Sequence, residues 1–202
     1  MKAHNKVRGS YRNIIKCYDE SSSISKDDGY RWYKEAGDMA IVIGKLAGYK
    51  KHQALFVGAG VLAALSPQAE WGDNIQWGIQ LVTSGIRKQT WNNHNKAMRI
   101  LAGEKPLDVL GGRKVRAFYK AIVAPHGTSE PVIDRHAVAV YMGRTVTERE
   151  LNFLASYKVM RRVQWAYKKA GKDLGVHHHV VQATTWSQWR INKGVAKQRK
   201  WS

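Results

Sequence analysis

Residues 106–123 read PLDVLGGRKVRAFYKAIV, and this stretch decides the fold that we expect. Residues 106–110 have the composition of one short helical turn, and residues 115–123 restart a helix with apolar side chains on one face. Gly111 and Gly112 form a tight turn between them. Glycines allow a backbone to approach a phosphate closely, and the start of the next helix presents free N–H groups. The stretch therefore predicts two helices joined at a turn that can hold a nucleic-acid backbone without reading its sequence.

The rest of the chain shows helical periodicity and little strand signal. Apolar residues recur at three- and four-residue steps between residues 30 and 46, and residues 52–65 are almost wholly apolar and rich in small side chains, which indicates a buried helix. Further helices are expected at residues 11–18, 74–85, 94–102, 134–141, 147–157, 161–170 and 176–189. The expected fold class is all-α.

Two of these helices begin with specific capping signals. Asp134 opens its helix, where a carboxylate accepts hydrogen bonds from the first N–H groups. Thr147 and Glu150 have the spacing of a capping box. Residues 19–29 contain a run of serines followed by Asp-Asp-Gly, and we expect a loop there.

Composition divides the chain into three parts. Residues 1–29 form a polar and basic N-terminal segment, residues 30–190 a helical domain, and residues 191–202 a basic tail. A chain of 202 residues is long enough for one sizeable core or for two small lobes. The two helices joined at the glycine turn, at about residues 106–123, fall inside the helical domain, for which we expect a two-lobed bundle.

The charge of the chain indicates a polyanionic partner. There are 34 Lys and Arg against 15 Asp and Glu, which gives a net charge of +19. Eight Trp and nine Tyr accompany this charge, and aromatic faces beside cations suit stacking on bases, so double-stranded DNA is favoured over an anionic membrane. We expect about half of these rings to belong to the core instead. Residues 151–202 hold eleven Lys or Arg and a single acid, which predicts a phosphate-facing surface there.

Several classes of protein are disfavoured. Cys17 is the only cysteine, which excludes an intramolecular disulfide framework and an iron–sulfur cluster held by several thiolates. The longest apolar run is too short to span a bilayer, and no secretory signal is visible. We therefore expect no cofactor, no membrane partner and no obligate protein partner, and a cytoplasmic location in association with DNA or the nucleoid.

Three adjacent histidines, His177, His178 and His179, suggest a metal site at first sight. On a helix, however, consecutive side chains point in different directions. No acid or cysteine stands nearby at ligand spacing. We therefore predict no metal site.

Lys114 and Asp134 are the candidate catalytic residues. One predicted helix and a loop separate them, so that both side chains can converge on one cleft. An amine can attack the C1′ carbon of a nucleotide and form a Schiff base after the base leaves, and a carboxylate can stabilise the positive charge that develops on the sugar. A helix-capping Asp and a solvated surface Lys explain the same two residues without catalysis.

Three segments, taken in order, resemble the endonuclease III group of helix-hairpin-helix DNA glycosylases. Residues 61–69, VLAALSPQA, are similar to its Leu-Leu-Ser-x-Gln-x segment. Residues 112–114, Gly-Arg-Lys, resemble the end of its hairpin, Leu-Pro-Gly-Val-Gly-Arg-Lys. Residues 133–136, Ile-Asp-Arg-His, resemble its Val-Asp-Thr-His. The resemblance covers about residues 52–145 and implies an all-α glycosylase-like fold.

The resemblance assigns roles to single residues. It places Lys114 on the Schiff-base lysine, Asp134 on the essential aspartate and Gln68 on the residue that wedges into the base stack when the target base is flipped out. The expected DNA contacts come from the turn and from the cations beside it and beside the aspartate, namely Gly111, Gly112, Arg113, Arg116 and Arg135. For Arg135, a phosphate contact and a simple surface position are both open.

The sequence also departs from that group. The hairpin is one residue tighter and lacks the proline, Arg135 replaces a small residue, and the four-cysteine cluster is absent. Trp71 and Trp77, which follow the wedge segment, either stack on a base or pack in the core, and core packing is favoured.

The expected function is a DNA base-excision glycosylase with associated AP-lyase activity, acting on a damaged or modified base through Lys114 and Asp134. A related possibility is the processing of a hypermodified base in a specialised genome. The alternative from a different class is a non-catalytic nucleic-acid-binding protein that uses the helix-hairpin-helix as a clamp.

Overall fold

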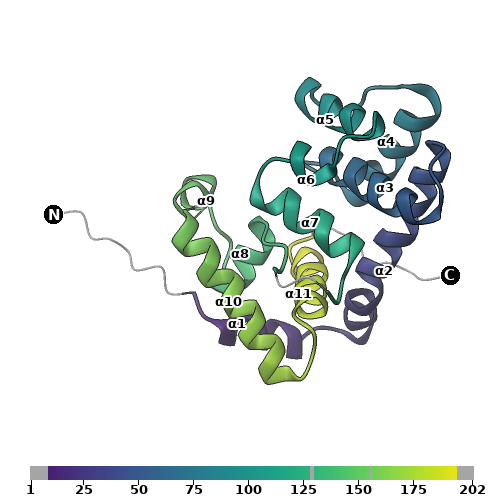
Figure 1. Ribbon diagram of the computed structural model, residues 1–202. Coiled ribbons are helices and arrows are strands. Elements are labelled where there is room, and N and C mark those ends of the chain that lie inside the picture. Colours follow the sequence, from purple (N-terminus) through teal and green to yellow (C-terminus); the bar gives the residue numbers. More distant parts are fainter. Residues whose placement is uncertain (1–8, 128–129, 155, 195–202) are drawn as a thin grey trace. The chain divides into compact units, whose positions relative to one another are not determined.

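The computed structural model describes residues 9–127, 130–154 and 156–194, which contain eleven helices and no strand (Figure 1). The expected all-α class is therefore confirmed. The helices are α1 (Tyr11–Asp19), α2 (Ser23–Leu46), α3 (Lys51–Leu65), α4 (Trp71–Ser84), α5 (Trp91–Leu101), α6 (Pro106–Val109), α7 (Arg113–Val123), α8 (Arg135–Met142), α9 (Glu148–Leu154), α10 (Tyr157–Leu174) and α11 (His178–Asn192).

The described residues form two compact units. Unit 1 draws on residues 9–32 and 130–194, and unit 2 on residues 33–127. Unit 2 is thus inserted into the chain of unit 1, and α2 begins in unit 1 and continues into unit 2. Residue 29, at which we expected the N-terminal segment to end, lies inside α2.

Unit 1 has its own apolar core between α1, α8, α10 and α11. Tyr167 of α10 is the largest fully buried side chain, and its hydroxyl donates to the carbonyl of Ala137 at 3.3 Å. Burial raises the pKa of the Tyr167 phenol far above its ordinary value, because the ionised form loses its hydration. The hydroxyl therefore stays protonated and anchors α10 to the first turn of α8.

The start of α2 corrects one sequence prediction. Residues 23–29 are helical, where we expected a loop. The Ser22 hydroxyl accepts a hydrogen bond from the Ser25 N–H at 3.2 Å, so the serine run starts a helix. Packing then fixes this turn, since a Cβ built on Gly29 would lie 2.0 Å from Thr184 Oγ1 of α11. Only glycine permits so close an approach of the two helices.

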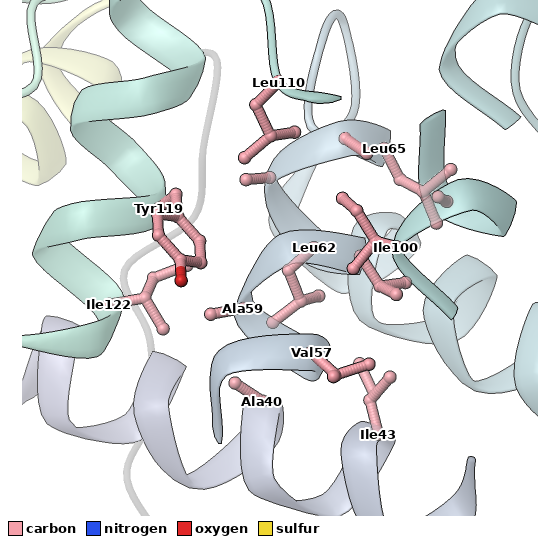
Figure 2. Close-up of a cluster of buried hydrophobic side chains, with 14 of the residues drawn as sticks. Ala40, Ile43, Val57, Ala59, Leu62, Leu65, Ile100, Leu110, Tyr119 and Ile122 are labelled. Carbon is pink, nitrogen blue, oxygen red and sulfur yellow. The ribbon is translucent and has the colours of Figure 1, made fainter. Parts of the chain in front are cut away.

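Unit 2 is built around α3, which contacts α4, α5, α6 and α7. Figure 2 shows the side chains that meet there. Leu62 of α3 is fully buried, as are Ile43 of α2 and Ile100 of α5, and Tyr119 of α7 is nearly so. Most of α3 is apolar on every face because other helices cover it on several sides. This confirms the buried helix expected at residues 52–65.

Small residues set the crossing of α2 and α3 within unit 2. A Cβ built on Gly44 would lie 2.1 Å from the carbonyl oxygen of Ala54, and one on Gly58 would lie 1.8 Å from that of Ala40. Neither helix backbone leaves room for a methyl group. The close crossing brings the two backbones together without intervening side chains.

Both capping signals are confirmed. Asp134 caps α8, and its Oδ1 accepts from the Ala137 N–H at 2.8 Å. Thr147 and Glu150 form the reciprocal pair of a capping box before α9, since the Thr147 N–H donates to Glu150 Oε2 at 3.0 Å and the Glu150 N–H donates to Thr147 Oγ1 at 3.3 Å.

In the part of the chain that the structure describes, no helix combines the length and the apolar character needed to cross a bilayer. The basic tail falls for the most part outside the described residues, as do the first eight residues of the N-terminal segment.

Candidate functional site

The Asp134 carboxylate is held by two hydrogen bonds of different origin. The backbone N–H of Ala137 occupies Oδ1 at 2.8 Å, and the indole N–H of Trp186 on α11 donates to Oδ2 at 2.9 Å. Asp134 is half-buried, and Val132 and Ile133 before it are buried in unit 1. One face of the residue is therefore anchored, and the carboxylate has a single fixed orientation at the positive end of a helix.

Three further side chains surround the Trp186 ring. Trp32 of α2 lies against it with ring centroids 4.9 Å apart, and His136 meets it edge-on at 6.4 Å. The guanidinium of Arg190 lies over the ring, 4.3 Å from its centroid. Arg190 itself is 7% exposed, so the cation–π contact forms away from water, where it is strong. Trp186 thus connects Asp134 to a buried cation.

A second acid also binds α11. Asp28 of α2 is 4% exposed and accepts a hydrogen bond from the Ser187 hydroxyl at 2.9 Å through Oδ2. Its Oδ1 is buried with no hydrogen-bond partner among the described residues. Trp186 and Ser187 are consecutive residues of α11, so Asp134 binds one of them and Asp28 binds the next.

The glycine turn in unit 2 is exposed. Gly112 has φ +73°, which glycine adopts at little cost, and it is the N-cap of α7. Lys114 is exposed in the first turn of that helix. A Cβ built on Gly111 would lie 3.8 Å from Nζ of Lys96, so a lysine of α5 also reaches the turn. The arrangement has the open backbone and the positive charge that a phosphate needs.

Arg116 has a role inside this motif. Its Nη1 donates to the carbonyl of Leu107 at 2.5 Å and to that of Leu110 at 3.3 Å. These carbonyls belong to α6 and to the residue that ends it, so Arg116 ties the short first helix to the second. The α6 helix has only four residues, which makes this tie important for the shape of the turn.

Gln68 lies at a strained turn between α3 and α4. Its φ of 61° is the one positive value found at a residue other than glycine in residues 9–127, 130–154 and 156–194. Its side chain is exposed. The side-chain amide of Gln89 donates to the carbonyls of Leu65 and Pro67 at 3.1 and 2.9 Å, which fixes the turn. Strain of about 1–3 kcal/mol at such a position is retained where the surrounding structure enforces it.

The remaining predicted contacts divide between surface and core. Arg135 is exposed at the first position of α8, and Arg113 is exposed at the first position of α7. Trp71 packs edge-on against Phe118 with centroids 6.3 Å apart, and both Trp71 and Trp77 are partly buried and pack against the unit 2 core. The core interpretation of these two tryptophans is therefore confirmed.

The predicted catalytic pair is distributed over both units. Lys114 belongs to unit 2 with Gln68 and the glycine turn, and Asp134 belongs to unit 1 with Arg135. The structure brings Asp134 together with Trp186 and brings Lys114 together with the glycine turn.

The histidine run differs from its predicted geometry. The ring centroids of His177, His178 and His179 are 4.2–5.3 Å apart, so the rings gather on one side. His177 precedes α11 as its N-cap, and its Nδ1 accepts a hydrogen bond from the His179 N–H at 3.4 Å, which holds its ring near the first helical turn. No group of three or more His, Cys, Asp or Glu in the described residues has the arrangement of a metal site.

A family model described as a family of unknown function (DUF7178) matches residues 1–193. The chain belongs to this family. No curated protein matches the chain, and no solved structure matches it.

In this DUF7178 chain, sequence reasoning missed Trp186 as the partner of Asp134 and Trp91 as an exposed ring. Trp91 opens α5, is 69% exposed, and has the guanidinium of Arg87 5.6 Å from its ring centroid. A tryptophan preceded by two basic residues and a helix cap was the available signal for Trp91. The Trp186 contact spans 52 residues and leaves no local signal.

Proposed function

We propose that the protein is a DNA base-excision glycosylase with AP-lyase activity, in which Asp134 and Lys114 act on a damaged or modified nucleotide. The observation that carries the proposal is the fixed orientation of the Asp134 carboxylate, held by a backbone N–H and by the Trp186 indole. Supporting it are the resemblance to helix-hairpin-helix glycosylases and the exposed lysine two residues after a glycine turn.

Asp134 would stabilise the positive charge that develops on the sugar as the glycosidic bond breaks. A carboxylate whose position is already fixed stabilises this positive charge without reorganising in the transition state. The target base must first leave the stack, because the C1′ carbon is not accessible inside a duplex. The strained and exposed turn at Gln68 suits insertion at the vacated position.

Lys114 would be the nucleophile. Its neutral amine attacks C1′, the base departs with the bonding electrons and takes up a proton, and the sugar ring opens to give a protonated Schiff base on the lysine nitrogen. Loss of a C2′ proton then expels the 3′ phosphate by β-elimination, which cuts the strand. Water finally hydrolyses the Schiff base and releases the lysine.

Positive charge at the glycine turn would position the DNA. Lys96 reaches the turn from α5, and Arg113 and Lys114 follow it directly on α7. Contacts of this kind bind the backbone in any sequence. Trp91, with Arg87 over its ring, adds an exposed aromatic face in the same unit.

Borohydride trapping tests both catalytic roles. The protein is incubated with duplexes that carry damaged or modified bases, and borohydride reduces the Schiff base to a stable covalent adduct. We expect an adduct with the native chain, none with Lys114→Ala, and a strongly reduced yield with Asp134→Asn. A broad set of substrates without any adduct, or an undiminished adduct in Lys114→Ala, would contradict the proposal.

One observation favours the non-catalytic clamp as the second candidate. Both oxygens of Asp134 accept hydrogen bonds that also stabilise unit 1, so the residue has a structural role without any chemistry. A clamp would bind DNA unchanged in Asp134→Asn and lose only a little affinity in Lys114→Gln. Bond cleavage that disappears in Asp134→Asn, with DNA binding retained, would decide against the clamp.

A further inference from the structure

One face of α10 carries aromatic and cationic side chains in alternation. Tyr157, Arg161, Trp165 and Lys169 follow each other at four-residue steps, so they lie in one row along the helix. Tyr157 is 54% exposed and Trp165 is 57% exposed, although both are large apolar rings. The helix buries its opposite face through residues such as Tyr167. The row is therefore the solvent side of an amphipathic helix, and it displays rings where polar side chains are usual.

Contacts within the row hold the side chains in place. The guanidinium of Arg161 lies 5.5 Å from the Tyr157 ring centroid, and its Nη1 donates to the Tyr157 hydroxyl at 3.3 Å. Tyr11 of α1 meets Trp165 edge-on at 6.2 Å, and Nζ of Lys169 lies 5.2 Å from the Tyr11 ring centroid. Each ring thus has a cation or a second ring beside it. Side chains that are already ordered lose less entropy when a ligand binds.

The charge of α10 itself is almost wholly positive. Within α10, Asp173 is the single acid, and it pairs with Lys169. Additional cations on the same helix are Lys158, Arg162, Lys168 and Lys172. Exposed rings among cations recruit a ligand that has flat π-systems and negative charges in regular alternation.

We propose that this row is a binding track for a single-stranded nucleic acid, with Trp165 and the Tyr157–Arg161 pair stacking on bases and the neighbouring cations contacting phosphates. Tyr157 and Trp165 are eight residues apart, which is about 12 Å along a helix, so they contact different nucleotides of one strand. A strand of unpaired bases meets these rings with its flat faces, whereas the bases of a duplex are stacked on each other and unavailable.

The track extends the proposed function, since it rests on its DNA-binding part and not on base excision. Base flipping or strand cleavage creates unpaired nucleotides, and a surface that binds them would retain such a substrate or product. The track can be tested by binding alone, so failure of the trapping experiment would leave its test intact.

Fluorescence anisotropy with three labelled probes tests the track. The probes are a short oligothymidylate, a strand of equal length and charge that lacks the bases, and a fully paired duplex. We expect Trp165→Ala to weaken binding of the oligothymidylate by about tenfold, because stacking contributes about 1–3 kcal/mol per base. Binding of the baseless strand and of the duplex should stay the same. Trp165→Phe should restore most of the affinity.

Two controls make the result specific. Tyr30 of α2 is 59% exposed and lies outside the row, so Tyr30→Ala should leave all three affinities unchanged. Thermal unfolding of each variant shows whether the fold survives the loss of the Tyr11–Trp165 contact, and Trp165→Phe covers the case in which it does not. An equal loss for the baseless strand would overturn the proposal. So would binding of polyglutamate with the same dependence on Trp165, since the occupant would then be an acidic polypeptide.

Discussion

Asp134 is a residue whose local and distant contacts serve different ends. The cap bond to Ala137 belongs to α8 alone, and any helix start with an aspartate can form it. The bond to Trp186 connects α8 to α11 and depends on the fold of unit 1. The first contact explains why an aspartate stands at this position, and the second explains why its carboxylate has only one orientation.

A double-mutant cycle on Asp134 and Trp186 should reveal this connection. We expect Trp186→Phe to destabilise the protein by at least about 1 kcal/mol, since one hydrogen bond is lost and a smaller ring replaces the indole. Asp134→Ala should cost about 2 kcal/mol, because the cap is lost as well. Urea unfolding of the double variant should show a loss smaller than the sum by about 1 kcal/mol. Strictly additive losses would mean that the hydrogen bond contributes nothing.

The same residue shows how far sequence reasoning reaches. The cap could be predicted, because an aspartate immediately before an apolar helical pattern is a local signal. The Trp186 contact could not, because it joins residues 52 positions apart that approach only when the core of unit 1 forms. The position of Lys114 near a helix start could be predicted from the glycines before it. The approach of Lys96 to the same turn could not, because Lys96 lies on a different helix.

At the scale of elements, glycines decide how closely helices approach. Gly58 of α3 faces the backbone of α2, and Gly29 of α2 faces Thr184 of α11. Gly72 of α4, in contrast, is a helical glycine whose added Cβ would meet no atom within 4 Å. Glycines that all lie in helices therefore differ in whether the structure has room for an added methyl group.

Alanine substitution at two glycines tests this contrast. We expect Gly58→Ala to destabilise the protein by about 1–3 kcal/mol, because the methyl group would lie 1.8 Å from the Ala40 carbonyl oxygen unless α2 and α3 separate. Gly72→Ala should stabilise it by about 0.5 kcal/mol through the lower entropy of the unfolded chain. The free energies of unfolding come from urea titration. A stable Gly58→Ala protein would show that the crossing is looser than described.

The cap of α9 predicts a dependence on pH. The Arg144 side chain and the Thr147 N–H both donate to Glu150, and they lower the pKa of its carboxyl from its usual value to about 2. A depressed pKa in the folded state means that this contribution to stability is complete above the unfolded pKa of about 4.3. It is lost as the pH falls from there to about 2. The contribution is a small one, because the pair is exposed to solvent.

Glu150→Gln isolates that contribution. The variant should lose the part of the acid dependence that belongs to this carboxyl, so the difference in Tm between native chain and variant should shrink as the pH falls below about 4. Glu104→Gln gives a matched comparison outside α9, because Arg99 lowers the pKa of Glu104 as well. This variant should show the same trend of Tm difference with pH while the cap of α9 stays intact. A Tm difference that stays constant down to the lowest pH would contradict the assignment.

Element boundaries were predictable where caps and periodicity agree and wrong where they conflict. The capping box at Thr147 and the buried helix at residues 52–65 satisfy both criteria. Residues 23–29 have the composition of a loop, yet the Ser22 cap and the packing of Gly29 against Thr184 make them helical. Tertiary contact overrode local propensity there.

At the scale of the whole molecule, the order of the chain hides its organisation. Residues 9–32 fold with residues 130–194, and residues 33–127 form the inserted unit. Hydrophobic periodicity identifies the helices but contains no information about which helices share a core. For this reason the all-α class could be predicted from the sequence, whereas the boundaries of the inserted unit could not.

The net charge of +19 belongs to the whole molecule and leads to the broadest prediction. Each phosphate that a Lys or Arg neutralises releases condensed counterions, so the association constant for DNA falls as a power of the salt concentration. If about six of the 34 cations contact phosphates, affinity for a paired duplex of arbitrary sequence should fall about a thousandfold between about 50 and 200 mM salt. Anisotropy titrations at several salt concentrations measure this dependence as the slope of the logarithm of the association constant against the logarithm of the salt concentration.

Substitutions show how much the glycine turn and the α10 row each contribute to this salt dependence. Arg113→Gln at the glycine turn should reduce the slope on duplex DNA by about one, because one phosphate contact is lost. Trp165→Ala should leave that slope unchanged, because stacking releases no counterions. Vesicles of anionic lipid provide the competing polyanion. Binding to such vesicles that matches the affinity for DNA, or DNA binding that does not respond to salt, would show that the charge of this chain has a purpose other than holding a nucleic acid.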